Sequence, residues 1–174
     1  MKGDLFCIYF CYNGERAATA LHVTSTDRML LGTVGGQLLL FDDQTITTTP
    51  VWRDSLGRPV SAIGSAGDTL AVAAGRTVTL LTAEEVTVLR ELPEDITALT
   101  LTLPVSVRAV GQRGGLYLCR FPDPARLLYH TNGKIFTLQC HEDLLAVGTE
   151  RGELLLLPLE ETISLTQGRI PPLP

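Results

Sequence analysis

Side chains that could act as nucleophiles, bases or metal ligands are few in this sequence, and they do not group together. The three histidines, His22, His130 and His141, lie in different parts of the chain, without the local spacing that is typical of metal sites. Ser65 lies in a Gly-Ser-Ala-Gly segment that lacks the strand-to-helix context of a nucleophile elbow, and no base can be assigned to it. We therefore expect no catalytic residues, no metal and no cofactor.

Paired acidic residues and glycines are two further features that could support chemistry. Glu84-Glu85 and Glu160-Glu161 fall in repeated exposed turns, which is typical of solvated charge rather than of an acid and base pair. The glycines form neither a phosphate-binding loop nor a nucleotide-binding pattern ahead of a helix, and the cysteines form no paired zinc motif. The sequence favours a binding function over an enzymatic one.

The composition limits the partners and the compartment. A chain of 174 residues with a net charge of −5, 19% charged and 45% hydrophobic residues predicts one domain that buries more surface than usual, some of it against a partner. Its acidic balance argues against nucleic acid, and the longest apolar run, Leu5 to Tyr12, is too short to cross a membrane. Cys7 and Cys11 are too far apart in a strand to form a disulfide. With Cys119 and Cys140 isolated, we expect a reduced cytoplasmic or nuclear setting.

Four segments with one plan follow one another along the chain. After a short opening come a turn, an apolar strand that ends in small residues, a glycine-containing turn, a second apolar strand and a polar break. With Gly32, Ala73, Gly111 and Gly148 taken as equivalent, the units repeat every 41, 38 and 37 residues. A period of about 40 residues with three to four short strands per unit is typical of β-propeller blades. The openings are Ala18-Thr19-Ala20-Leu21, Val60-Ser61-Ala62-Ile63, Ile96-Thr97-Ala98-Leu99 and Ile135-Phe136-Thr137-Leu138.

Turn residues and apolar runs favour strands over helices. Runs such as 38–41 and 154–157 are apolar at successive positions, so both faces of each sheet must be covered. Radial stacking of small sheets covers both faces, whereas a single sandwich, the second choice, gives each strand one solvated side. We predict an all-β, propeller-like fold of about four small antiparallel blades. The expected hairpin turns are Gly35-Gly36, Gly75-Arg76, Gly114-Gly115 and Arg151-Gly152.

Two of the units resemble the WD-repeat β-propeller family. Residues 31–42 and 145–154 follow its plan of a small-residue strand, a glycine turn and an apolar strand, and Phe41-Asp42 matches its aromatic-acid ending. The resemblance covers roughly residues 17–160. It implies a scaffold that displays loops to protein partners, usually with about seven blades in a closed ring.

Four units are fewer than such a ring contains. We expect an open or partial propeller, completed by another chain or by a second copy; a small ring closed by an extra strand at 5–12 is the alternative. The expected organisation is a leading strand and connection over 1–16, blades over 17–58, 59–94, 95–133 and 134–162, and an extended proline-rich tail over 163–174. The tail either docks on a partner or is a frayed end.

The family's strand order sorts the charges onto two faces. Arg76, Arg113 and Arg151 fall at equivalent turns of successive blades, and we predict that they contact a partner together with Arg53 and Arg58. The opposite face would carry most of the acidic residues, although acids also favour turns for local reasons. The arginine face would also include Arg16 and Lys134.

Two local features leave alternatives open. Trp52, the only tryptophan, is either an interface anchor or a packing residue. Asn132-Gly133 is typical of a tight hairpin but falls in a predicted connection between blades, so the register there and the place of Lys134 remain open.

The function that these features predict is a non-catalytic scaffold or adaptor, a subunit of a larger multiprotein assembly with other protein subunits as its partners. The alternative is a self-contained four-bladed propeller that binds a peptide or a small molecule in its central channel.

Overall fold

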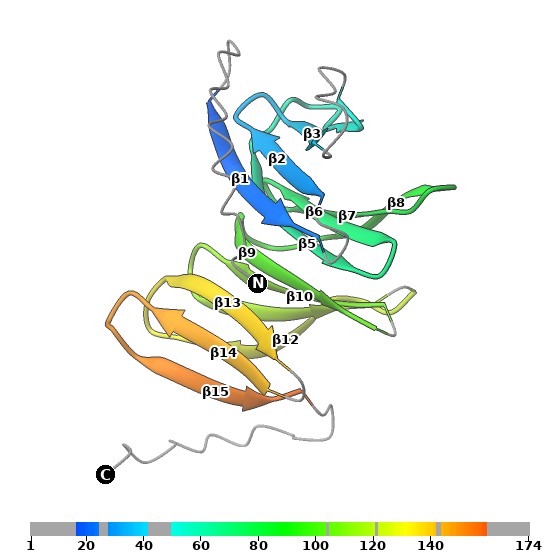
Figure 1. Cartoon of the computed structure of the whole chain (residues 1–174). Helices are drawn as coiled ribbons and strands as arrows, with labels where there is room; N and C mark the ends of the chain where they lie inside the picture. Colours follow the sequence, from blue (N-terminus) through cyan, green and yellow to red (C-terminus); the bar gives the residue numbers. More distant parts are fainter. Residues whose placement is uncertain are drawn as a thin grey trace, which may run out of the picture.

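Short strands, without any helix, make up the part of the chain that the computed structural model describes, which is residues 17–24, 28–41, 50–103, 105–120, 122–141 and 144–159. The strands form four small antiparallel sheets that follow one another along the chain (Figure 1). The prediction of an all-β fold with four small blades is confirmed. The predicted leading strand at 5–12 and the tail at 163–174 lie outside the described residues.

Each sheet is a meander in which consecutive strands pair. The first contains β1 (Ala18–Val23), β2 (Met29–Thr33), β3 (Gln37–Phe41) and β4 (Trp52–Arg53). The second contains β5 (Val60–Ala66), β6 (Thr69–Ala74), β7 (Thr77–Leu81) and β8 (Val86–Glu91). The third contains β9 (Ile96–Thr102), β10 (Ser106–Gly111), β11 (Gly115–Cys119) and β12 (Arg126–His130). The fourth contains β13 (Ile135–His141), β14 (Leu144–Thr149) and β15 (Leu154–Pro158).

The turn between the second and third strands of every sheet contains a glycine in the left-handed region. Its φ is 74° at Gly36, 58° at Gly75, 94° at Gly114 and 75° at Gly152. Residues other than glycine are strained at such angles because they carry a Cβ atom. The predicted glycine hairpins are confirmed. The turns are also hydrogen bonded to the connections between sheets, as where the Arg76 carbonyl accepts from the Leu92 amide at 2.8 Å. Turns and connections therefore lie at the same end of the sheets.

A bulge recurs in the innermost strand of every sheet, because the pairing register shifts between its first and third residues. When the four sheets are aligned by this bulge, the predicted equivalence of Gly111 with Gly32 is wrong by one residue. Gly111 pairs with Ile96, the first residue of its inner strand, whereas Gly32 pairs with Ala20, the third. Ala109 and Gly111 both fit a small-residue pattern, so the sequence pattern could not decide the register. In this alignment the residues equivalent to Gly32 in the second, third and fourth sheets are Ala73, Val110 and Gly148.

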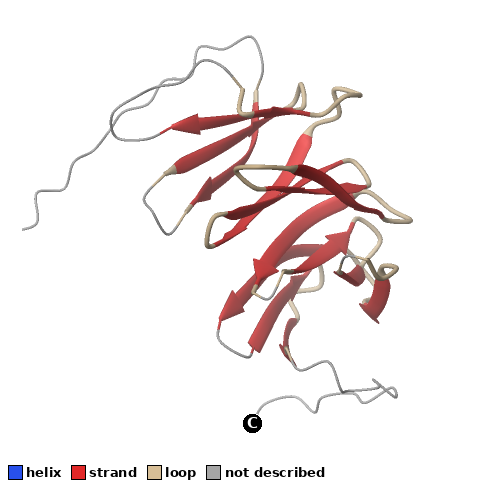
Figure 2. Cartoon of the chain, turned by 90° about the vertical axis from the view of Figure 1, so that its right-hand side faces the viewer, coloured by secondary structure: helices blue, strands red, loops and turns tan. Residues whose placement is uncertain are grey.

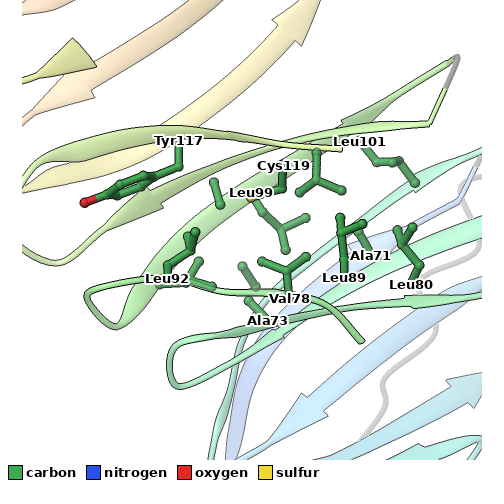
Figure 3. Packing of buried hydrophobic residues seen from close by; sticks show 14 residues of the cluster. Ala71, Ala73, Val78, Leu80, Leu89, Leu92, Leu99, Leu101, Tyr117 and Cys119 are labelled. Atoms are coloured by element: carbon green, nitrogen blue, oxygen red, sulfur yellow. The ribbon is translucent and has the colours of Figure 1, made fainter. Parts of the chain in front are cut away.

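Successive sheets pack face to face through apolar side chains. Figure 3 shows the contact between the second and third sheets, where Val78 of β7 lies in the same cluster as Leu99 of β9 and Cys119 of β11. Similar clusters fill the contact between the first and second sheets and that between the third and fourth. These three contacts, which we call the internal junctions, form the core.

The stack of sheets is open between its first and last members. The inner strands pack in the order β1, β5, β9, β13, and no described strand of the first sheet packs to a comparable extent on one of the fourth. Figures 1 and 2 show the sheets as an arc with the first and fourth sheets at its two ends. Each end therefore has a sheet face that no other described sheet covers.

Candidate interaction surfaces

Each sheet has two faces, which we name by chain order. The forward face points toward the next sheet and the backward face toward the preceding one. Cross-strand partners share a face, so the pairs Ala20–Gly32 and Gly32–Leu38 place these residues together on the forward face of the first sheet. In the second sheet the backward face includes Ile63 and Val72, which pack in the cluster with Leu38. Every internal junction joins one forward face to one backward face.

On the forward face of the fourth sheet, β14 and β15 present apolar side chains that no other described sheet covers, whereas β13 presents the exposed Thr137 and Gln139. Leu154 of β15 pairs with Gly148, the equivalent of Gly32, and its side chain is 67% exposed. Leu156, two residues further on the same face, is 46% exposed. At the position of Leu154 the other three sheets have leucine or valine that is at most 1% exposed, so apolar surface that the internal junctions bury is open here. These buried equivalents are Leu38, Val78 and Leu116.

The backward face of the first sheet is exposed along its inner strand. Leu21 and Val23 of β1 are 62% and 60% exposed, although the equivalents of Leu21 in the other sheets are buried. Further out on the same face, Leu31 and Phe41 are buried in a small cluster of their own. The exposed apolar surface at this end is therefore concentrated on β1. The buried equivalents of Leu21 are Ile63, Leu99 and Leu138.

The predicted arginine contacts lie at the end of the sheets where the glycine turns meet the connections. Arg76, Arg113 and Arg151 are exposed at equivalent turns of the second, third and fourth sheets. The Nε of Arg76 donates to the Leu92 carbonyl at 2.8 Å and lies 3.9 Å from the Glu91 carboxylate. Exposed acidic residues lie at the same end, so the charge of this surface is mixed. They include Glu91, Asp95, Glu150 and Glu153.

Arg58 is engaged within the chain rather than displayed. Its Nη2 donates to Asp54 Oδ1 at 2.8 Å, and its Nη1 donates to Thr77 Oγ1 at 3.0 Å in the second sheet. The Asp54 carboxylate also accepts from the amides of Leu56 and Arg58. The hydrogen bond from Arg58 lowers the pKa of Asp54 below its usual range, and the same contact raises the pKa of Arg58. This ion pair orders the connection between the first and second sheets.

The other predicted residues near this connection differ in exposure. Trp52 is half-buried and packs against the cluster between the first and second sheets, which is the packing role that the sequence left open. Arg53 is exposed. Asn132 and Gly133 lie between β12 and β13, in a connection between sheets and not in a hairpin, so Lys134 stays at the arginine end. There its carbonyl accepts from the Glu150 amide at 2.8 Å.

A buried carboxylate that the sequence did not reveal ties the connection before the third sheet to that sheet. Glu94 accepts from the Tyr117 hydroxyl at 2.7 Å and from the Arg113 amide. Burial, and then the contact with Glu94, raise the pKa of Tyr117 to about 12. The only signal in the sequence was a tyrosine within an apolar strand, because a buried phenol needs a polar partner.

The inner strands line a hollow of about 560 Å³ on the concave side of the arc. The structure brings together two residues here that the sequence kept apart, since His22 Nε2 lies 2.8 Å from Ser65 Oγ. Burial lowers the pKa of His22. Among the described residues that line the hollow there is no Asp or Glu to orient the imidazole. In the described ranges, no group of three or more His, Cys, Asp and Glu side chains could hold a metal ion.

Two predictions concern compartment and membrane. Cys119 is a free buried thiol, as expected, and Cys140 is half-buried, whereas Cys7 and Cys11 lie outside the described residues. Burial raises the pKa of Cys119 to about 11. Over the ranges that the structure covers, none of the secondary structure is a helix of the length and apolarity that spanning a membrane requires.

The comparisons with known proteins support the fold alone. No family model and no curated protein sequence matches the chain. Among solved structures, the computationally designed protein Ika4 is similar with a TM-score of 0.67 and 18% identity, over 86% of this chain and 95% of that one. A chain of the mitotic checkpoint complex is similar with a TM-score of 0.65 and 10% identity, over 81% of this chain and 48% of that one. The chain thus spans about half the length of that second protein. Together with the four sheets described above, these similarities identify the arrangement as a four-bladed β-propeller type.

Proposed function

We propose that the chain is a non-catalytic scaffold or adaptor of the WD-repeat type, a subunit of a multiprotein assembly in the cytoplasm or nucleus. The observation that carries this proposal is the uncovered forward face of the fourth sheet. Leu154 is exposed at a position that all three internal junctions bury, and Leu156 lies exposed beside it on the same face. A contiguous exposed apolar surface of this kind is typical of protein interfaces. The similarity to a chain of the mitotic checkpoint complex supports the proposal at the level of the fold.

A photo-cross-linking experiment tests this function. A benzophenone amino acid replaces Leu154, and in a matched variant it replaces Val88, which is exposed to a similar extent, 63% against 67%, but lies on the outer strand β8. In cells that express the chain, we expect a defined protein adduct from position 154 and none from position 88. The absence of an adduct at both positions, together with a chain that stays a single folded copy, would refute the scaffold.

The arginine end is the finer part of the proposal. Arg76, Arg113 and Arg151 recur at equivalent turns, and arginine is over-represented where interfaces are most energetic. In a pull-down from the same cells, the triple variant R76E/R113E/R151E is expected to lose a protein partner that the wild-type chain captures, while the fold stays intact. The matched control is R28E/R126E, which changes exposed arginines outside these turns. Equal affinity of the triple variant and the control would end the arginine proposal.

The hollow that the inner strands line, which we call the axial hollow, supports a second function. A space of about 560 Å³ with His22 and Ser65 in contact has the size and mixed polarity of a site for a peptide or a small molecule. A ligand would stabilise the folded chain in a thermal shift screen, and S65W, which fills the hollow, would remove that shift. A screen without any stabilising peptide or small molecule counts against this alternative.

A further inference from the structure

The two ends of the arc carry opposite halves of one kind of contact. The uncovered face of the fourth sheet is a forward face, and the exposed face of β1 is a backward face. In every internal junction a forward face packs against a backward face, with the inner strands side by side. The forward face of the fourth sheet in one molecule could therefore pack against the backward face of the first sheet in another molecule, which no described sheet covers.

At two of the internal junctions, the bulge residue of one sheet donates a hydrogen bond to the first inner-strand residue of the next. Thr19 Oγ1 donates to the Val60 carbonyl at 2.7 Å, and Thr97 Oγ1 donates to the Ile135 carbonyl at 3.2 Å. The bulge residue is a small hydroxyl residue, and the residue that follows it across the junction is a large β-branched residue that is at most 2% exposed. At the junction between the second and third sheets the same positions hold Ser61 and Ile96, and Ser61 Oγ donates to the Ala73 carbonyl of its own sheet at 3.4 Å.

The open ends reverse these sizes. The bulge position of the fourth sheet holds Phe136, whose side chain is 65% exposed. The first inner-strand position of the first sheet holds Ala18, which is also exposed. A large residue and a small one have exchanged places, so Phe136 and Ala18 together can fill a junction that a hydroxyl residue and a β-branched residue fill elsewhere.

Gly148 leaves space where this exchange would occur. At its equivalent Gly32, an added Cβ would lie 2.5 Å from Val60 Cγ1, because Val60 packs directly on the glycine. At Gly148 an added Cβ would meet only Thr137, from its own sheet, at 2.6 Å. The site that Val60 occupies in the first junction is thus open on the fourth sheet. An alanine at that site leaves room for the ring of Phe136.

We propose that two copies of the chain join head to tail, with the forward face of each fourth sheet against β1 of the other copy, to form one ring of eight sheets. This proposal rests on the proposed scaffold function and names the partner as a second copy. A head-to-tail contact used twice closes a two-fold ring. Eight blades lie within the range that closed propellers adopt. In the similar chain of the mitotic checkpoint complex, the matched part is 48% of that chain, so a similar arrangement occurs there within a longer chain.

The mass of the full chain in solution is the first test. Light scattering after size-exclusion chromatography should give twice the chain mass of 18.8 kDa across a tenfold range of concentration. L154R and L21R change exposed residues at opposite ends, and each should give folded single copies, whereas the control V88R should remain paired. A wild-type single copy throughout, or species larger than two copies, would overturn the proposal.

A disulfide trap tests the direction of the contact. In a background without the native cysteines other than the buried Cys119, the variant A18C/F136C should form a covalent pair on mild oxidation, and A18C or F136C alone should not. Linking by either single variant would mean that like ends meet, which contradicts the head-to-tail ring. Circular dichroism of the reduced variants checks that each one folds.

These tests separate the second copy from the scaffold function. If the chain is a single copy and residue 154 still cross-links to a different protein, the second copy is refuted and the scaffold function stands. If the chain is a single copy and position 154 gives no adduct, both are refuted.

Discussion

The junction between the second and third sheets and the open forward face of the fourth sheet use equivalent positions in opposite states. Val78 is fully buried at the first of these surfaces, and Leu154 is mostly exposed at the second. Both surfaces are apolar and both belong to the same repeated unit, so strand pattern alone does not distinguish them. The difference arises from whether another sheet follows. In a repeat fold, a residue's exposure therefore depends on its place in the array as much as on its type.

The largest expected effect on stability comes from replacing leucine with alanine at a buried position of an internal junction and, for comparison, at the equivalent exposed position of the fourth sheet. L38A removes a fully buried side chain from an internal junction and should lower the free energy of unfolding by about 2–5 kcal/mol. L154A, at the equivalent exposed position, should change it by less than about 1 kcal/mol. Urea unfolding of protein dilute enough to be single copies measures both. Equal losses would mean that the fourth sheet is covered within one copy.

The next effect concerns the hydrogen bond that ties the connection before the third sheet to that sheet. Y117F leaves the buried Glu94 without its hydroxyl donor and should lower the free energy of unfolding by about 1–3 kcal/mol. Y129F, which removes the hydroxyl of a half-buried tyrosine of β12, is the control and should have a smaller effect. If the two substitutions cost the same, the contact between Glu94 and Tyr117 does not stabilise the connection.

A smaller effect should depend on pH. Because Arg58 lowers the pKa of Asp54 in the folded chain, this carboxylate contributes stability in full above its unfolded pKa of about 3.8. That contribution is lost as the pH falls through the lower pKa of the folded state. D54N should cost about 1–2 kcal/mol at neutral pH and should flatten the pH dependence of stability in acid. Thermal unfolding at a series of pH values checks this, and an unchanged acid profile in D54N would exclude the ion pair as its source.

The last prediction concerns the different rates at which a thiol reagent modifies the two cysteines, without any change in stability. Cys119 lies in the junction between the second and third sheets with its pKa raised to about 11, whereas Cys140 is half-buried beside the axial hollow. A thiol reagent at neutral pH should modify Cys140 in the folded chain and Cys119 only after unfolding, because the thiolate is the reactive form. Mass spectrometry of the digested protein locates the modification. Rapid labelling of Cys119 in the folded chain would indicate that this junction opens readily.

Much of the architecture could be predicted from the sequence because it depends on local chemistry. The glycine turns require positive φ, and the uninterrupted apolar runs require two covered faces, so four stacked sheets followed directly. The sequence pattern placed Gly111 where the structure has Val110, because small residues, Ala109 and Gly111, lie on both sides of Val110. Only the cross-strand pairing identifies Val110 as the equivalent residue.

The candidate sites were harder to predict because they depend on contacts between sheets. The contact of His22 with Ser65 joins neighbouring inner strands and has no signal in either segment. Arg58 matched an arginine pattern, yet Asp54 four residues earlier engages it within the chain. The exposure of Phe136 depends on the absence of a described sheet beyond the fourth, which no local pattern encodes.

The recurring bulge and the bonds between turns and connections have a consequence for folding. Among the described strands, the extensive contacts between sheets join neighbours in chain order. A single copy of the chain therefore approximates a linear array whose free energy is a sum of sheet terms and nearest-neighbour terms. In a single copy, the second and third sheets each have two neighbours and should exchange their amide hydrogens most slowly, and unfolding should begin at the first or the fourth sheet. Such an array can also gain or lose a whole sheet without a change in the geometry of the remaining junctions, which is how a lineage could vary the number of its blades by duplication.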